Sequence, residues 1–216
     1  GEEQERGWLH ADLRPVPQLH RPTPRMGWRL PPHQLLKPCV QLVGLDAARA
    51  LLEAKRPLLW AGAGVLFAGA TDELRSLAEL TGTPVFCTMP GKSAIDERHP
   101  LALGAGSGAT TGPAHQWLQS CDLLMALGSS LTRSPYGQLI RPDLFLIQNT
   151  NNPDDIGKDE AVDIGLVGDT KLTLLALIDE VKGRIGSNRA QRGGVENEIA
   201  RQKADWLRDW IPLLES

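Results

Sequence analysis

The stretch Pro57-Leu-Leu-Trp-Ala-Gly-Ala-Gly-Val65 decides how this chain is expected to fold. A continuous apolar run, residues 57–61, leads directly into two glycines, Gly62 and Gly64. Such a run, without alternation, is typical of a strand that is buried on both faces in a parallel sheet. Glycines after the strand suit a tight turn into a helix, and in a dinucleotide fingerprint they let the backbone approach a pyrophosphate. The third glycine of that fingerprint is replaced by Phe67, so a tight turn is the simpler interpretation.

The same alternation of apolar runs and helical segments continues along the chain. Further strands are predicted at 84–88, 101–103, 123–127, 144–147 and 162–167, and helices at 46–54, 71–81, 113–120 and 170–182. Thr71 and Asp169 are expected to cap the helices that follow them, and Gly82 to end the helix before it. The inward stripe of the last helix is predicted to contain Leu172, Leu175, Ala176 and Ile178. Six short strands alternating with helices predict a three-layer α/β/α fold with a six-stranded, mostly parallel, Rossmann-like sheet.

Composition and charge exclude several classes of protein. The 216 residues are 41% hydrophobic with a net charge of −3, which argues against a disordered chain and against a nucleic-acid or anionic-membrane surface. No apolar run approaches the ~20 residues of a membrane span. Cys39, Cys87 and Cys121 form no CxxC pair or Cys/His cluster, which argues against a metal site and a disulfide framework and favours a cytoplasmic setting. Cys87 and Cys121 fall in or beside apolar runs and are interpreted as small core residues.

Both flanks of the regular region differ from it. Residues 1–44 contain seven of the sixteen prolines, which a helix or an inner strand does not tolerate, so they are predicted to form an extended interdomain linker. Residues 45–186 are predicted to form one domain. Residues 187–216 are predicted to form a polar linker and a helix, in which Trp206 and Trp210 stand at i and i+4 and share a face.

No catalytic constellation stands out in the chain. Residues 104–109 fit G-x-G-x-x-A but are more simply a flexible turn, and Gly91-Lys92-Ser93 lacks the earlier glycine of a P-loop. His99 and His115 are single histidines without an identifiable Ser or Cys partner, which favours structural roles. The acidic residues within 154–160 suit a cation, but their spacing is not that of an EF-hand, and a solvated loop is the simpler interpretation.

Several segments occur in a distinctive order and spacing. They are Pro57–Val65, Leu77–Val85, Gly91–Ser93 with His99–Gly104, Cys121–Gly128, Asp155–Lys158 and Leu166–Lys171. In this order they resemble the central domain of thiamine-diphosphate-dependent enzymes of the acetolactate synthase and 2-keto-acid decarboxylase type. The resemblance implies a Rossmann-like domain of the DHS-like NAD/FAD-binding type. It also implies a homo-oligomeric parent enzyme that uses thiamine diphosphate and magnesium.

The resemblance further implies that the thiamine diphosphate and magnesium sites lie outside this chain. In the family, the first domain carries the glutamate that activates the thiazolium ring, and the third carries a GDG-to-Asn motif that holds magnesium and diphosphate. Gly168-Asp169 is followed by Thr170 and so is not that motif. The chain is therefore expected to be an excised central domain, not catalytic by itself. Its implied partners are the N- and C-terminal thiamine-diphosphate-binding domains of the same polypeptide, joined through residues 1–44 and 187–216.

In some relatives this domain binds FAD or ADP at the carboxyl ends of the strands. The positions expected to line such a site are Gly62, Ala63, Gly64, Gly128, Ser129, Thr150, Asn151, Asn152, Gly168 and Asp169. The family often reads HIDID where Thr150 and Asn152 replace the two acids, and these side chains accept ribose hydroxyl groups less firmly than carboxylates do. The basic position that relatives use after Gly128 is altered to Ser129-Ser130, with Arg133 further on. A scaffold domain is the leading hypothesis, and a stand-alone nucleotide-binding module and a pure interaction domain remain as alternatives.

Overall fold

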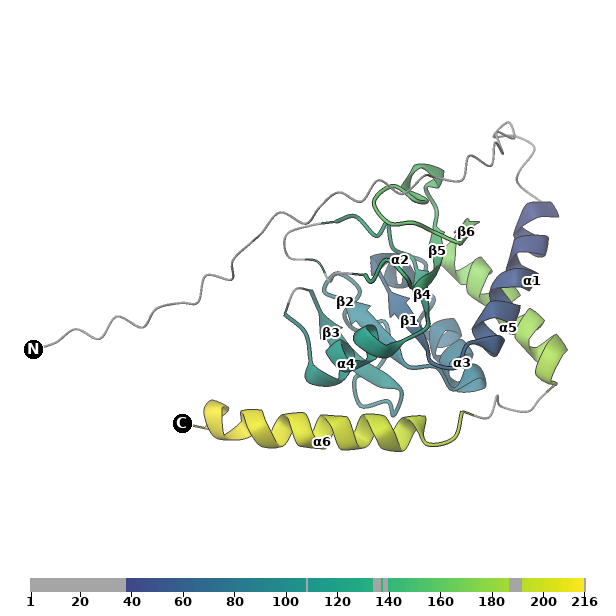
Figure 1. Ribbon diagram of the computed structural model, residues 1–216. Helices are drawn as coiled ribbons and strands as arrows, with labels where there is room; N and C mark the ends of the chain where they lie inside the picture. Colours follow the sequence, from purple (N-terminus) through teal and green to yellow (C-terminus); the bar gives the residue numbers. More distant parts are fainter. Residues whose placement is uncertain (1–37, 108, 134–136, 138–139, 187–191, 216) are drawn as a thin grey trace, which may run out of the picture. The chain divides into compact units, whose positions relative to one another are not determined.

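The protein contains the predicted six-stranded sheet at its centre (Figure 1). The computed structural model describes residues 38–107, 109–133, 137, 140–186 and 192–215. The strands are β1 (Pro57–Ala61), β2 (Val85–Thr88), β3 (Ala102–Gly106), β4 (Leu123–Leu127), β5 (Phe145–Thr150) and β6 (Ile164–Val167). Their order is β3-β2-β1-β4-β5-β6 and every neighbouring pair is parallel. This order, which reverses direction between β1 and β4, is that of a doubly wound Rossmann-like sheet.

Helices cover both faces of the sheet. They are α1 (Pro38–Glu53), α2 (Ala63–Phe67), α3 (Thr71–Thr81), α4 (Gly112–Ser120), α5 (Thr170–Ile185) and α6 (Val195–Leu214), with a 3₁₀ turn, η1, at Pro153–Asp155. The crossovers from β1 to β2 and from β3 to β4 run in opposite directions along the sheet, so right-handed connections place α3 and α4 on opposite faces. Helices α1 and α5 pack together with α3, whereas α6 packs against α4 (Figure 1). The predicted three-layer architecture is therefore confirmed.

The core follows from the apolar runs of the two central strands. Every residue of β1 and of β4 is buried, as the absence of alternation predicts. Trp60 of β1 packs edge-on against Phe86 of β2, with ring centroids 5.0 Å apart. Cys87 and Cys121 are buried, which confirms them as core residues, and burial raises the pKa of both thiols to about 11.

The start of the first helix was predicted too late in the chain. Helix α1 begins at Pro38, eight residues before the predicted start at Asp46. Proline is tolerated in the first turn of a helix because the amide hydrogen it lacks has no partner there. Residues 38–44 are thus helical rather than extended. The predictions made for residues 1–37 and 187–191 fall outside the part of the chain that the structure describes.

The predicted helix caps are partly right. Asp169 caps α5, accepting a hydrogen bond of 3.0 Å from the amide of Leu172, and Gly82 ends α3 in the left-handed conformation with φ 61°. Thr71 is not a cap, because Ala70 occupies that position and Thr71 is the first helical residue. The short helix α2 was not predicted. Only three residues, 68–70, separate it from α3.

The predicted inward stripe of α5 was largely wrong. The buried residues are Thr170, Thr173, Leu174, Leu177, Ile178 and Val181, whereas Leu172, Leu175 and Ala176 are exposed. Only Ile178 was placed correctly. The helix packs between α1 and α3, and this packing selects a continuous i, i+3, i+4 stripe that includes two threonines.

Two strands extend further than the apolar runs predict. Strand β3 includes part of the glycine-rich segment predicted as a turn, because Gly104, Ala105 and Gly106 pair with β2. Strand β5 continues through the polar residues to Thr150, which pairs with Val167 of β6. Pairing with a neighbouring strand therefore overrides the local preference of these residues for turns. None of the helices in the described part of the chain combines the length and apolarity that crossing a membrane requires.

Candidate functional site

A crevice lies at the carboxyl edge of the sheet, where the loops after β1 and β4 leave in opposite directions. Ligands of open α/β sheets bind at such a switch point. Two cavities of about 320 and 350 Å³ open there, and both are lined by Ala63, Gly128 and Ser130. The first cavity is also lined by Trp60, Gly62, Thr88, Met89, Pro90, Gly106, Ser107, Ser129, Leu131, Thr132 and Gly137. The second cavity is also lined by Gly64, Phe67, Ala68, Thr150, Asn151, Asp155, Asp169 and Thr170.

The predicted site residues largely come together in this crevice. Gly62 and Ser129 line the first cavity; Gly64, Thr150, Asn151 and Asp169 line the second; Ala63 and Gly128 line both. Asn152 and Gly168 line neither cavity. Asn152 instead caps η1, its side chain accepting a hydrogen bond from the amide of Asp154. The structure thus brings together the loops that the sequence singled out.

Glycines are required here because two backbone turns touch. A Cβ atom on Gly62 would lie 2.3 Å from the carbonyl oxygen of Gly128, and one on Gly64 would lie 2.6 Å from the Cα atom of Gly128. The amide of Gly64 donates to the carbonyl oxygen of Gly128 over 2.9 Å. Gly128 itself has φ 60°, in the left-handed region that favours glycine. These glycines therefore have a structural role whether or not a pyrophosphate binds beside them.

Buried amides at the end of β5 hold the loops of the crevice. The Asn149 side chain is fully buried; its Oδ1 accepts a hydrogen bond from the amide of Gly128 over 3.2 Å. Its Nδ2 donates to the carbonyl oxygens of Leu166 and Gly168 over 3.0 and 3.2 Å. One side chain thereby ties the turn after β4 to the end of β6. Sequence analysis did not assign Asn149 this role; the available signal was a polar run continuing directly from an apolar strand.

Gln148, the residue before Asn149, ties down the other side of the crevice. Its Nε2 donates to the carbonyl oxygens of Ser129 and Asp155, each over 3.1 Å, and its Oε1 accepts from the amide of Gly157. Buried polar groups of this kind are costly unless every bond is made, so they specify a single arrangement of the loops.

Carboxylates dominate the electrostatics of the second cavity. Asp155 accepts a hydrogen bond of 3.3 Å from the hydroxyl of Thr150, so a carboxylate lies beside this position although residue 150 is not acidic. Asp169 contributes the second carboxylate while it caps α5. Among the described residues that line the two cavities there is no Lys or Arg. The second cavity therefore favours hydroxyl and amine donors over phosphate groups.

Some of the weaker candidates from the sequence have structural partners. Arg133 donates its backbone amide to Asp159 and its guanidinium to Glu160, which accounts for two members of the acidic cluster. No group of three or more His, Cys, Asp and Glu residues able to hold a metal occurs among the residues described. His99 bonds to Glu79 through Nε2 and accepts the amide hydrogen of Leu101 at Nδ1. These contacts agree with the structural interpretation of His99.

Comparisons with known proteins match the regular part of the chain. Residues 45–177 match the family described as "Thiamine pyrophosphate enzyme, central domain". The chain is 36% identical over 153 residues to a probable acetolactate synthase large subunit from Methanococcus aeolicus, covering 70% of this chain and 26% of that protein. It is 38% identical over 134 residues to an acetolactate synthase from Mycobacterium leprae, covering 61% and 21%. The chain thus spans about a quarter of the length of these relatives.

A solved structure shows the same fold. Benzoylformate decarboxylase from Polynucleobacter necessarius superposes with a TM-score of 0.59 at 23% identity, covering 72% of this chain and 28% of that one.

Proposed function

This chain belongs to the family of thiamine pyrophosphate enzyme central domains, and from that premise we propose that it is the central domain of an acetolactate-synthase-like enzyme acting on 2-keto acids. In this proposal the chain is a scaffold and does not catalyse by itself. The thiamine diphosphate and magnesium are held by N- and C-terminal domains of the same polypeptide, within a cytoplasmic homo-oligomer.

The chemistry of the crevice supports a scaffold role. Asp155 and Asp169 are the ionisable groups among the described residues that line the two cavities. Both are already engaged, with the hydroxyl of Thr150 and the amide of Leu172. Among the described residues that line the cavities, no Lys or Arg is placed to receive a diphosphate, and the hydroxyl that lies beside a carboxylate, that of Thr150, is hydrogen-bonded to Asp155.

A second candidate function is the binding of FAD or ADP in the crevice. The cavities have the size of small-ligand sites and lie at the switch point of the sheet. Asp155 beside Thr150 offers an acceptor for ribose hydroxyl groups. The residues therefore fit the nucleoside half of such a ligand, whereas the carboxylates disfavour its diphosphate. The adenine nucleotide remains the second candidate for that reason.

A thermal-unfolding titration of the full chain tests both functions, with thiamine diphosphate plus magnesium, FAD and ADP as separate ligands. A ligand that binds the folded state raises the melting temperature with its concentration. A scaffold is expected to show no saturable rise with thiamine diphosphate and no turnover of pyruvate. Either of these signals would overturn the proposal.

A matched pair of variants identifies nucleotide binding in the second cavity. A saturable rise with FAD or ADP that Asp155→Asn abolishes, and that Asp154→Asn leaves intact, would establish the second candidate. Asp154 is an appropriate control because it is exposed and does not line either cavity. No rise with FAD or ADP would eliminate the second candidate and leave the scaffold.

A further inference from the structure

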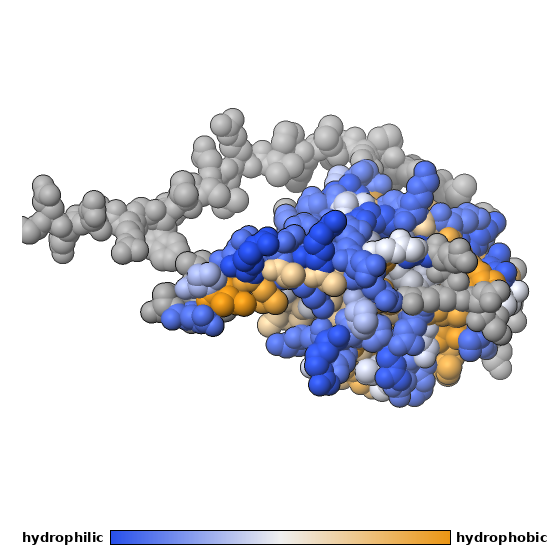
Figure 2. Space-filling view, turned by 90° about the horizontal axis from the view of Figure 1, so that it is seen from below, coloured by the Kyte–Doolittle hydropathy of each residue, from blue (hydrophilic) through white to orange (hydrophobic). Residues whose placement is uncertain are grey.

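Helix α6 is attached to the rest of the domain by few apolar contacts. Among its described side chains only Ile199 is fully buried, and Trp206 is half-buried against Gly112 of α4. Toward its C-terminal end, Leu207, Trp210 and Ile211 are exposed. Figure 2 shows hydrophobic side chains gathered at the left of this face of the molecule. A helix with so little buried surface belongs to the part of a fold that opens first.

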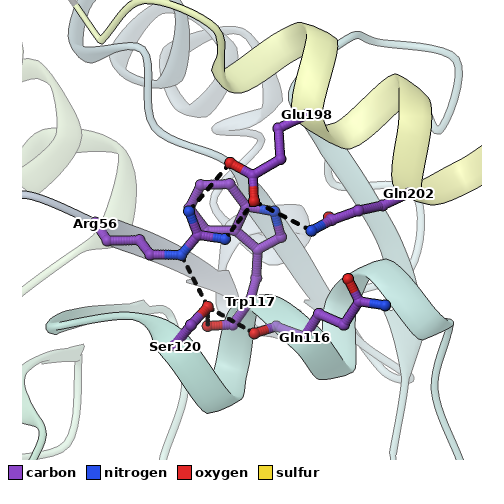
Figure 3. Close-up of polar contacts among 6 residues, drawn as sticks. All are labelled: Arg56, Gln116, Trp117, Ser120, Glu198 and Gln202. Carbon is purple, nitrogen blue, oxygen red and sulfur yellow. Dashed lines mark hydrogen bonds and ion pairs between the residues drawn. The ribbon is translucent and has the colours of Figure 1, made fainter.

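A polar cluster centred on Arg56 connects α6 to the rest of the domain (Figure 3). The Arg56 guanidinium donates to both oxygens of Glu198 on α6, over 2.7 and 3.1 Å. It also donates through Nε to the hydroxyl of Ser120 and lies 3.7 Å from the ring centroid of Trp117, both on α4. Two parallel bonds to a carboxylate, with the cation stacked on an aromatic ring, are a geometry that Lys cannot reproduce.

The carboxylate side of this cluster is equally well held. Gln202, one turn after Glu198, donates to the same carboxylate over 3.2 Å. The hydrogen bonds from Arg56 hold the pKa of Glu198 below its usual range, so this carboxylate is ionised at neutral pH. The side chains of Arg56 and Glu198 are both more than two-thirds buried. The pair is therefore less affected by solvent screening than the fully exposed ion pairs of the surface.

Just before α6, Arg192 binds the ends of two helices and is followed by two glycines. Arg192 donates to the carbonyl oxygens of Leu51 and Ala54 at the end of α1, and to that of Thr81 at the end of α3. Cations are favoured at helix C-termini because of the exposed carbonyl groups there. Two glycines, at 193 and 194, then follow; neither would meet another atom within 4 Å if it carried a Cβ, and Gly194 has φ 88°. Such residues absorb backbone rotation easily.

We propose that α6 is a releasable arm, hinged at Gly193-Gly194 after the Arg192 anchor. The Arg56–Glu198 pair latches it to the segment before β1 and, through the contacts of Arg56 with Ser120 and Trp117, to α4. In the latched state the pair fixes the position of the exposed apolar residues of α6 relative to the sheet. Loss of the pair frees the helix while the sheet and the helices α1, α3 and α5 stay folded. The proposal concerns the chain's conformation and does not depend on the function proposed above.

Hydrogen exchange of the full chain, followed by mass spectrometry, tests the latch. The variant Glu198→Ala is expected to speed exchange of the α6 amides about tenfold or more, because a charged, bidentate contact is lost. Peptides from β1 and β4 are expected to exchange at unchanged rates. The control is Asp205→Ala, which removes the exposed pair with Arg208 on the same helix and is expected to change α6 exchange less than about twofold.

The double variant Arg56→Ala with Glu198→Ala completes the test. If the two residues act as one latch, the double variant exchanges its α6 amides no faster than the faster single variant. Unchanged α6 exchange in Glu198→Ala would overturn the proposal. So would a rise of equal size in β1 and β4, because it would show that α6 opens only with the whole domain.

Discussion

Gly128 lies where the two turns of the crevice touch, and its φ of 60° is strained for any residue with a Cβ. A Cβ atom there would also lie 2.6 Å from the amide nitrogen of Val65. The sequence predicts that Gly128 belongs to the site, because it follows an apolar strand. The contact with Gly62 and Gly64 was not predictable, because it depends on which strands become neighbours in the sheet.

The variant Gly128→Ala is expected to destabilise the fold by about 2–4 kcal/mol, from backbone strain and collision with the facing turn. The measurement is the free energy of unfolding in urea. Gly183→Ala is the matched control: this residue lies inside α5 and a Cβ there meets nothing within 4 Å. Replacing it is expected to stabilise by about 0.5–1 kcal/mol. Equal effects of the two substitutions would contradict the role given to the turn contact.

Asn149 and Asp155 illustrate what residue-level prediction misses. Asn149 lies outside the strand predicted at 144–147, yet it is fully buried in β5. Asp155 was read as part of a solvated acidic cluster, yet it lines the second cavity beside Thr150. Local composition marks both as surface residues. Their actual positions depend on the pairing of β5 with β6 and on the return of the chain through η1.

At the scale of elements, α5 shows why a helix can be predicted while its buried face is not. Its existence and its cap at Asp169 follow from local sequence. Contact with α1 and α3 determines which residues of the helix are buried. Two of these residues are threonines, Thr170 and Thr173, which a search for an apolar stripe does not select. Leu172 and Leu175 therefore lie outside the stripe.

This corrected stripe is directly testable. Leu174→Ala is expected to cost about 2–5 kcal/mol of unfolding free energy, because this side chain is completely buried. Leu172→Ala is expected to cost less than about 1 kcal/mol, since 68% of that residue is exposed. Urea unfolding of the two variants measures both. A larger loss of unfolding free energy for Leu172→Ala than for Leu174→Ala would support the buried stripe predicted from the sequence.

For the whole molecule, the number of strands and the mostly parallel sheet were predictable because continuous apolar runs and glycine turns are local signals. The boundaries of β3 and β5, the start of α1 and the packing of α6 were not. The strand boundaries and the packing of α6 depend on partners distant in the sequence, such as Glu198 for Arg56.

Alkaline pH is expected to weaken the whole fold through its buried thiols. Burial raises the pKa of Cys87 and Cys121 from 9.0 to about 11. Between these values the unfolded chain releases thiol protons that the folded chain keeps, so stability is fully present below pH 9 and falls as the pH rises to about 11. The loss is at most about 3 kcal/mol per thiol.

Urea unfolding across this pH range measures the effect. The double variant Cys87→Ala with Cys121→Ala is the reference, because other groups that titrate in the same range are common to both proteins. The unfolding free energy of the double variant is expected to depend less steeply on pH. Parallel pH profiles would contradict the assignment to the thiols.

The amide network of Gln148 and Asn149 has a thermodynamic consequence for any ligand of the crevice. The turn after β4 and the end of β6 are already held by hydrogen bonds made during folding. A ligand would thus enter a preorganised site and would lose little affinity to loop ordering. Its binding would show a heat-capacity change set by the apolar surface it covers, without the larger change that accompanies coupled folding.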